Sequence, residues 1–263
     1  MLRMSIQYSS GILLKWTLFA LALTSGLVSS GISYSGERLI RFGIPVTDYP
    51  PYVMRQGNGL SGIVGDVFAA ITKSLGYEFE LVVLPEKRLD YSARKGELDA
   101  IPTALEWEND TTGYLWTAGI ITVSDSVVMT KDRQVNITAA DDLNGMSAVL
   151  MLGFTYPSFE TMAKSGAIRT SRVQNFDSLL HMVDRNRVDF GIIDQNVADW
   201  VIRDQNLKFA QGLHFSVSKF DAVDMRIVLY PTKDWTQFVN EFNAALAKFK
   251  ASSAWEDILT KYR

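Results

Sequence analysis

The 263-residue sequence contains no cysteine, which excludes disulfide bonds, thiol nucleophiles, zinc–thiolate centres and a lipidated N-terminal cysteine. It has only two histidines, His181 and His214, and neither belongs to a metal-ligand spacing. It also lacks any block of basic residues, and 26 basic against 29 acidic residues give a formal charge of −3. Binding of nucleic acid through its phosphates is therefore not expected. We predict no metal and no cofactor.

Long hydrophobic runs are also absent, apart from one near the N-terminus. Residues 16–28 read WTLFALALTSGLV, which is shorter than the roughly 20 residues that span a bilayer. Arg3 and Lys15 precede this run, small residues follow it at 29–36, and the first 36 residues contain no acid. This pattern is typical of a signal peptide, which we place at about residues 1–35, with cleavage giving an exported, periplasmic protein. An uncleaved N-terminal anchor is the alternative.

Short apolar runs alternate with amphipathic helical patterns along the rest of the chain. The order strand–helix–strand–helix–strand occurs once between 39 and 105 and again between about 132 and 215. Such an order predicts mostly parallel sheets flanked by helices, and so an α/β fold. Extended segments at 120–132 and 213–231 connect the two sets. We therefore expect two lobes, two crossover strands as the hinge, and a cleft between the lobes.

The segment Thr47 to Met54, TDYPPYVM, follows the predicted strand 39–44. Two adjacent prolines stop a helix and suit a central strand badly, so this is a stiff loop. Its Tyr49 either packs into the core or forms a floor for a ligand. Thr103 and Asp194 also lie at or just beyond predicted strand ends, where open parallel sheets bind ligands. Asp194 requires a partner, which is either a ligand or the following helix that it caps.

A series of short motifs runs in order from about residue 39 to the C-terminus. The motifs are Tyr49-Pro50-Pro51-Tyr52, Gly62 to Asp66, Gly96-Glu97-Leu98-Asp99-Ala100, Asp142-Leu143-Asn144-Gly145, Gly153-Phe154-Thr155, Asn186-Arg187-Val188-Asp189 and Lys261-Tyr262. This order resembles the bacterial extracellular solute-binding proteins of family 3. These are two-lobed type II periplasmic binding proteins that serve ABC transporters in the uptake of polar amino acids and related solutes.

The resemblance implies a division of the chain and a set of ligand-binding residues. Lobe 1 would comprise 37–125 plus 220–263, and lobe 2 would comprise 130–215. Tyr49 would stack on the ligand and Thr103 would hydrogen-bond to it from lobe 1. Thr155 would offer donors from lobe 2, and Asp194 would bind an ammonium group of the solute.

The chain departs from the family pattern after the strand at 99–105. Relatives that bind α-amino acids carry an arginine there that grips the carboxylate, but residues 105–116, LEWENDTTGYLW, contain none. Arg88 would supply a replacement cation. Alternatively, an acidic site of Glu106 and Asp194 would prefer a cationic solute without a carboxylate, such as a polyamine. Trp107 is either a wall of the cleft or a packing contact.

These observations predict a non-catalytic solute-binding protein. It would be a monomer that captures a small polar solute, amino acid-like or a polyamine, and delivers it to the permease of an ABC importer. One alternative is a sensory or partner-binding module with a degenerate cleft. Another is an enzyme that resembles periplasmic cyclohexadienyl dehydratases, with Glu106 and Glu108 as candidate acids.

Overall fold

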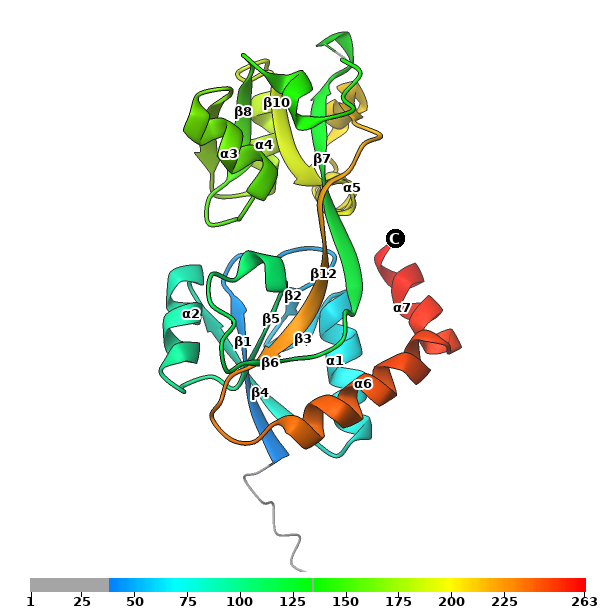
Figure 1. The fold of residues 1–263 in the computed structure, drawn as a ribbon. Coiled ribbons are helices and arrows are strands. Elements are labelled where there is room, and N and C mark those ends of the chain that lie inside the picture. The colour runs from blue at the N-terminus through cyan, green and yellow to red at the C-terminus, as the bar shows by residue number, and fades with distance from the viewer. Residues whose placement is uncertain (1–37, 134) are drawn as a thin grey trace, which may run out of the picture. The chain divides into compact units, whose positions relative to one another are not determined.

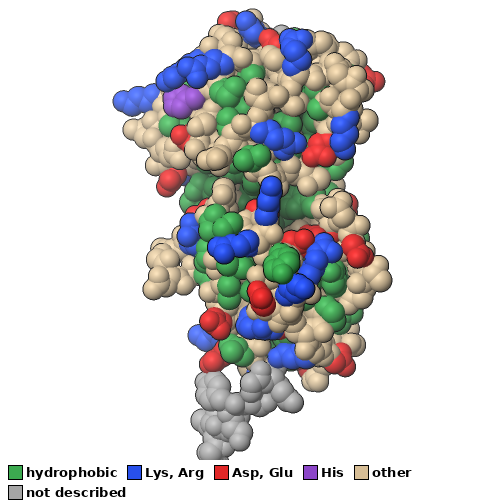
Figure 2. Space-filling view, turned by 90° about the vertical axis from the view of Figure 1, so that its left-hand side faces the viewer, with side chains coloured by type: hydrophobic (Ala, Val, Ile, Leu, Met, Phe, Trp, Pro, Cys, Tyr) green, Lys and Arg blue, Asp and Glu red, His purple; other side chains and the backbone are tan. Residues whose placement is uncertain are grey.

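The computed structural model describes residues 38–133 and 135–263. The predicted signal peptide lies outside these residues. No helix within them has the length and apolar character needed to cross a membrane. On the face drawn in Figure 2, acidic and basic side chains are interspersed.

Lobe 1 is built on one end of a mixed sheet, in the order β4-β1-β5-β12 (Figure 1). β1 runs parallel to both β4 and β5, whereas β12 is antiparallel to β5. The strands are β1 (Leu39–Pro45), β4 (Glu78–Leu84), β5 (Ala100–Thr103), β6 (Leu115–Trp116) and β12 (Phe220–Leu229). The helices are α1 (Ile63–Ser74), α2 (Glu86–Arg94), α6 (Thr236–Lys250) and α7 (Ser253–Tyr262).

Lobe 2 is built on the other end of the sheet path, in the order β7-β10-β8-β9. β8 is parallel to β9 and β10, and β7 is antiparallel to β10. The strands are β7 (Ile121–Thr130), β8 (Ser147–Met151), β9 (Arg169–Val173), β10 (Phe190–Asp194) and β11 (Leu213–Phe215). The helices are α3 (Pro157–Ser165), α4 (Phe176–Asp184) and α5 (Gln195–Asp204).

Two ten-residue strands, β7 and β12, connect the lobes as an antiparallel pair (Figure 1). They correspond to the extended segments predicted at 120–132 and 213–231. The second segment is interrupted, because β11 ends at Phe215 and β12 begins only at Phe220. Four short 3-10 helices occur in the connections: η2 (Leu105–Trp107), η3 (Lys131–Arg133), η4 (Ala140–Leu143) and η5 (Lys208–Gly212).

The tyrosine loop after β1 is held by backbone geometry. Tyr49 pairs with Val53 in an isolated bridge, and the hairpin of β2 (Met54–Gln56) and β3 (Gly59–Ser61) follows. Gly62 then has a φ of 94°, and a Cβ there would lie 2.4 Å from the carbonyl oxygen of Tyr52. Only glycine fits such a close approach. The Gly62 amide also donates to the hydroxyl of Tyr262, which ties the loop to α7.

The core of lobe 1 is aromatic. The rings of Phe42 and Phe68 stack with centroids 4.1 Å apart. The spacing of Phe238, Phe242, Leu246 and Phe249 in the sequence predicts an apolar stripe on a C-terminal helix. In α6 the first three are buried in this core and Phe249 is half-buried against it, which confirms the stripe.

Candidate ligand-binding site

Tyr49 lies at the centre of a cluster of aromatic rings drawn from both lobes. Its ring centroid is 6.4 Å from that of Trp107 in lobe 1, and 5.6 and 6.4 Å from those of Phe154 and Phe176 in lobe 2. Phe154 and Phe176 themselves meet edge to face at 5.7 Å. We call these four residues the aromatic cluster. Tyr49 and Trp107, both predicted as site residues, are thus brought together, whereas the sequence analysis did not single out Phe154 or Phe176.

A pair of carboxylates borders this cluster on the side of lobe 1. Thr103, at the end of β5, donates a 3.0 Å hydrogen bond from Oγ1 to Glu108 Oε1. Burial and the nearby carboxylate of Asp90 raise the pKa of Glu108, although the bond from Thr103 opposes this. The side chain of Glu86, at the start of α2, is exposed, and partial burial and the charge of Glu108 raise its pKa.

Three other residues that were predicted to line the site are exposed. Glu106 is exposed, because the turn of η2 points it to solvent and Glu108 towards Thr103. Arg88 is exposed on α2 and forms no ion pair with any residue of the described chain. Thr155 is exposed in the loop between β8 and α3, and no described residue hydrogen-bonds to its side chain.

Asp194 is a buried helix cap. Its Oδ1 accepts hydrogen bonds from the amides of Asn196 and Val197 at the start of α5, at 2.7 and 3.3 Å. Its Oδ2 accepts from the Tyr52 hydroxyl at 3.0 Å and the Ser124 amide at 3.2 Å. Of the two partners considered from sequence, the structure shows the helix.

The N-terminus of α3 also has an internal partner. Asp221 accepts hydrogen bonds from the amide of Ser158 at 3.1 Å and from its hydroxyl at 2.6 Å. Helix N-termini attract anions because their amides are unpaired and the dipole is positive there. Here a carboxylate of the chain already occupies that position. Asp221 was not singled out from the sequence, and its position within the extended segment 213–231 gave no signal of this role.

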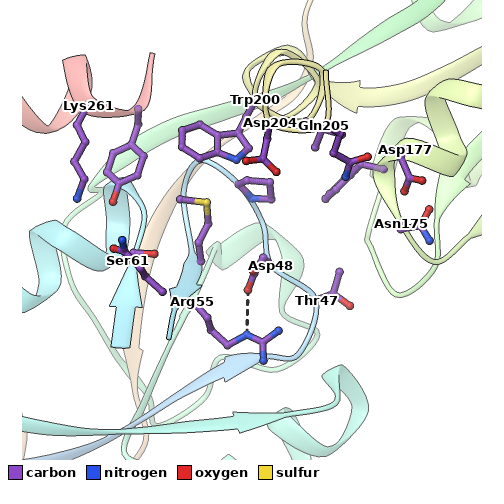
Figure 3. A pocket seen from close by; sticks show the side chains of 16 residues that line it. Thr47, Asp48, Arg55, Ser61, Asn175, Asp177, Trp200, Asp204, Gln205 and Lys261 are labelled. Atoms are coloured by element: carbon purple, nitrogen blue, oxygen red, sulfur yellow. Dashed lines mark hydrogen bonds and ion pairs between the residues drawn. The ribbon is translucent and has the colours of Figure 1, made fainter. Parts of the chain in front are cut away.

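Figure 3 shows a pocket of about 520 Å³. Phe176 of the aromatic cluster is one of its lining residues. One wall comes from the tyrosine loop and β2, where Arg55 pairs with Asp48 at 3.3 Å. The opposite wall comes from the first turn of α4 and from α5, and includes Asp177 and Trp200. Tyr49 is not part of its lining. Residues 38–133 and 135–263 contain no group of three or more His, Asp or Glu side chains arranged to hold a metal ion.

The sequence matches the family described as bacterial extracellular solute-binding proteins, family 3, over residues 40–263. The chain belongs to this family. It is 20% identical over 255 residues to the arginine-binding extracellular protein ArtP of Bacillus subtilis (strain 168), covering 94% of this chain and 97% of that protein. The family assignment made from motif order is thereby confirmed.

Solved structures show the same fold. An ancestral arginine-binding protein bound to arginine matches with a TM-score of 0.67 and 21% identity, over 86% of this chain and 98% of that one. A histidine kinase sensor domain with similarity to periplasmic binding proteins matches with a TM-score of 0.69 and 18% identity, over 86% and 96%. The fold is the two-lobed α/β fold of type II periplasmic binding proteins, as predicted.

Proposed function

We propose that this protein is a periplasmic solute-binding protein for a small cationic solute without an α-amino-acid head group. The solute binds between lobe 1 (37–125 plus 220–263) and lobe 2 (130–215) and is delivered to the permease of an ABC importer. The protein acts as a monomer, without catalysis, after removal of its signal peptide.

The observation that carries this proposal is the pairing of aromatic faces with carboxylates. The ring of Tyr49 lies 6.4 Å from that of Trp107 and 5.6 Å from that of Phe154, measured between centroids. Glu86 approaches the same place, since a Cβ on Gly153 would lie 3.8 Å from its Cγ. Aromatic faces and carboxylates both attract ammonium and guanidinium groups.

Groups that would hold an α-amino acid are missing or already engaged. No arginine stands in residues 105–116 to grip a carboxylate. Asp194, which would bind the amino group, accepts four hydrogen bonds from its own chain. The N-terminus of α3 is closed by Asp221. A zwitterionic head group would therefore meet few free partners.

The same aromatic cluster gives a reason for the lobes to close on a ligand. Its rings come from both lobes, so only the closed arrangement completes the contacts, and a ligand that uses them favours that arrangement.

A thermal-shift screen tests the proposal. Residues 36–263 are screened against putrescine, spermidine, choline, arginine, glutamine and glutamate. We expect stabilisation by the carboxylate-free cations, about 2.7 kcal/mol at a ligand concentration 100 times the dissociation constant. Stabilisation by glutamate or glutamine alone would contradict the proposal.

A sensory or partner-binding role is the second candidate. One observation favours it: Tyr49 already contacts Phe154 and Phe176, so side chains of this chain fill the centre of the cleft. The similarity to a histidine kinase sensor domain is compatible with that role. It predicts that no solute stabilises the protein, while a protein partner is retained on the immobilised chain. A dehydratase-like activity has less support, because among the described residues the cation that acts on Glu108, Arg94, is already paired with Asp90.

A further inference from the structure

Asp125 lies in the middle of the crossover strand β7, between Ser124 and Ser126. Val123 and Val127, on the same face of the strand, are 3% and 1% exposed. In the sheet register Asp125 stands opposite Asp194 of β10 and Phe220 of β12. Across an antiparallel pair, opposite residues lie on the same face of the sheet. Asp125 and Asp194 are therefore neighbouring acids at the junction of the lobes.

Of the three acids Asp125, Asp194 and Asp221, Asp125 is the one without a hydrogen-bond partner among the described residues. Asp194 accepts four hydrogen bonds, and Asp221 accepts from Ser158. Asp125 accepts none from residues 38–133 and 135–263. Burial, together with the charges of Asp194 and Asp221, raises the pKa of Asp125 to about 8.

The tyrosine loop reaches this pair of acids through Tyr52. The ring centroid of Tyr52 is 5.2 Å from that of Tyr49, and its hydroxyl donates to Asp194, the residue opposite Asp125. Burial, and then the charges of Asp194 and Asp125, raise the pKa of Tyr49 and of Tyr52, and burial and the charge of Asp125 raise the pKa of Tyr156. Asp125 thus lies within electrostatic reach of the central ring of the aromatic cluster.

The nearest lysine is turned to the other face of the strand. Lys219 Nζ donates to Ser126 Oγ at 2.7 Å and to Gln195 Oε1 at 2.9 Å. Successive side chains of a strand point to opposite faces, so Ser126 and Asp125 face away from each other. The chain therefore supplies acids and phenols around Asp125, but no cation that pairs with it in the described residues.

We propose that Asp125 is the residue that binds the ammonium or guanidinium group of the solute, at the junction of the lobes opposite Asp194. This inference rests on the proposed function, and it names the floor of the site. Asp194 holds the loop and α5 in place, while Asp125 supplies the carboxylate that remains free to bind the ligand.

A proton accompanies this binding. In the empty protein near neutral pH the carboxyl group of Asp125 is mostly protonated, and the cation favours the ionised form. Binding at pH 7 therefore releases up to one proton from Asp125 to solvent. The groups that set this equilibrium are Asp194, Asp221, Tyr49, Tyr52 and Tyr156. The affinity for a cation rises by up to about tenfold per pH unit below pH 8.

Isothermal titration calorimetry with putrescine, spermidine and choline tests the inference. The variant is Asp125→Asn, and the matched control is Asp257→Asn, which removes the same charge at an exposed site on α7. Titrations at pH 7 in phosphate and in Tris count the protons released. For the probe that binds, we expect Asp125→Asn to weaken binding by about tenfold to a hundredfold. The wild type should release a proton on binding, and Asp257→Asn should match it in affinity and in proton release.

The outcomes separate the two proposals. If the wild type binds a probe and Asp125→Asn binds it equally well, the assignment of Asp125 is wrong and the proposed function stands. If the wild type binds none of the probes, the proposed function fails and the assignment fails with it. Should Asp125→Asn not fold, the wild-type proton count decides: binding at pH 7 without proton release overturns the assignment.

Discussion

The hydroxyl of Tyr52 donates a 3.0 Å hydrogen bond to Asp194 Oδ2, across 142 positions of sequence. Tyr52 is 1% exposed and also accepts a hydrogen bond from Asn196 Nδ2 at 2.9 Å. The pair joins the tyrosine loop of lobe 1 to the end of β10 in lobe 2. It is a buried polar contact between the lobes, close to the crossover strands.

Removing this hydroxyl should weaken the junction. We expect Tyr52→Phe to lower the free energy of unfolding by about 1–3 kcal/mol, because Asp194 is a buried charged acceptor. Urea denaturation followed by tryptophan fluorescence measures this. Tyr91→Phe is the control, since Tyr91 is 59% exposed and should change stability by no more than about 0.5 kcal/mol. Equal effects of the two variants would show that the Tyr52–Asp194 bond adds no stability.

Two substitutions distinguish the helix-capping role of Asp194 from the effect of its negative charge. Asp194→Asn keeps a good N-cap residue, whereas Asp194→Ala removes the cap at a cost of about 0.5–2 kcal/mol, plus the loss of the Tyr52 partner. We therefore expect Asp194→Ala to lower the melting temperature more than Asp194→Asn does. Both changes remove a like charge beside Asp125, so both should lower its pKa. Carboxyl carbon shifts followed by NMR through a pH titration report that change.

The pH dependence of stability should carry the signature of Asp125. Its folded-state pKa of about 8 lies above the unfolded value of about 3.9, so the native state binds more protons between these pH values. Its contribution to stability is thus present below about pH 4 and is lost as the pH rises through 8, by at most about 1.4 kcal/mol per unit.

We expect the Asp125→Asn variant to lack the loss of stability that ionisation of Asp125 causes as the pH rises. The stability of the variant relative to the wild type should increase from pH 5 to pH 8, measured by urea unfolding without ligand. A difference that stays constant over this range would show that Asp125 ionises as it does in the unfolded chain. Asp257→Asn again provides the control.

The ion pair of Arg41 with Asp99 is structural, and the pKa of Asp99 is shifted in the opposite direction to that of Asp125. Asp99, with 6% of its side chain exposed, accepts from Arg41 Nη2 at 2.8 Å and from Thr232. Burial opposes its ionisation, but these hydrogen bonds outweigh burial and lower the pKa of Asp99. Its contribution to stability is therefore present above the unfolded pKa and is lost as the pH falls through the folded value.

We expect Asp99→Ala to lower the free energy of unfolding by about 1–3 kcal/mol, since it removes a buried acceptor that bonds to both Arg41 and Thr232. Asp90→Ala breaks the exposed pair with Arg94 and should change it by less than about 1 kcal/mol. Chemical denaturation at pH 7 compares the two variants. Similar losses for both would mean that burial adds nothing to the Arg41–Asp99 pair.

Much of the fold was predictable because it depends on local patterns. The strand at 39–44, the glycine after α1 and the stripe on α6 follow from periodicity and chain breakers, and the structure confirms them. The position of Tyr49 at a strand end was also predictable, because two prolines mark the loop.

The composition of the site was predictable only in part. Phe154 and Phe176 meet Tyr49 through tertiary packing, which no local spacing encodes. Glu106 and Glu108 could not be told apart from sequence, because a single turn of η2 decides which faces Thr103. Asp125 did leave a signal, an acid within the apolar run ITVSDSVVMT, that strand alternation alone did not distinguish from a solvent-facing position.

β7 pairs with β12 near Ile121 and with β11 near Met129, so one continuous backbone belongs to both lobes. Asp125 stands midway along it. Neutralising that carboxylate, by a proton or by a bound cation, relieves repulsion from Asp194 and Asp221 on the adjoining strands. Because the empty protein carries a proton on Asp125 near neutral pH, a bound cation takes the place of that proton at the junction, on the strand that both lobes share.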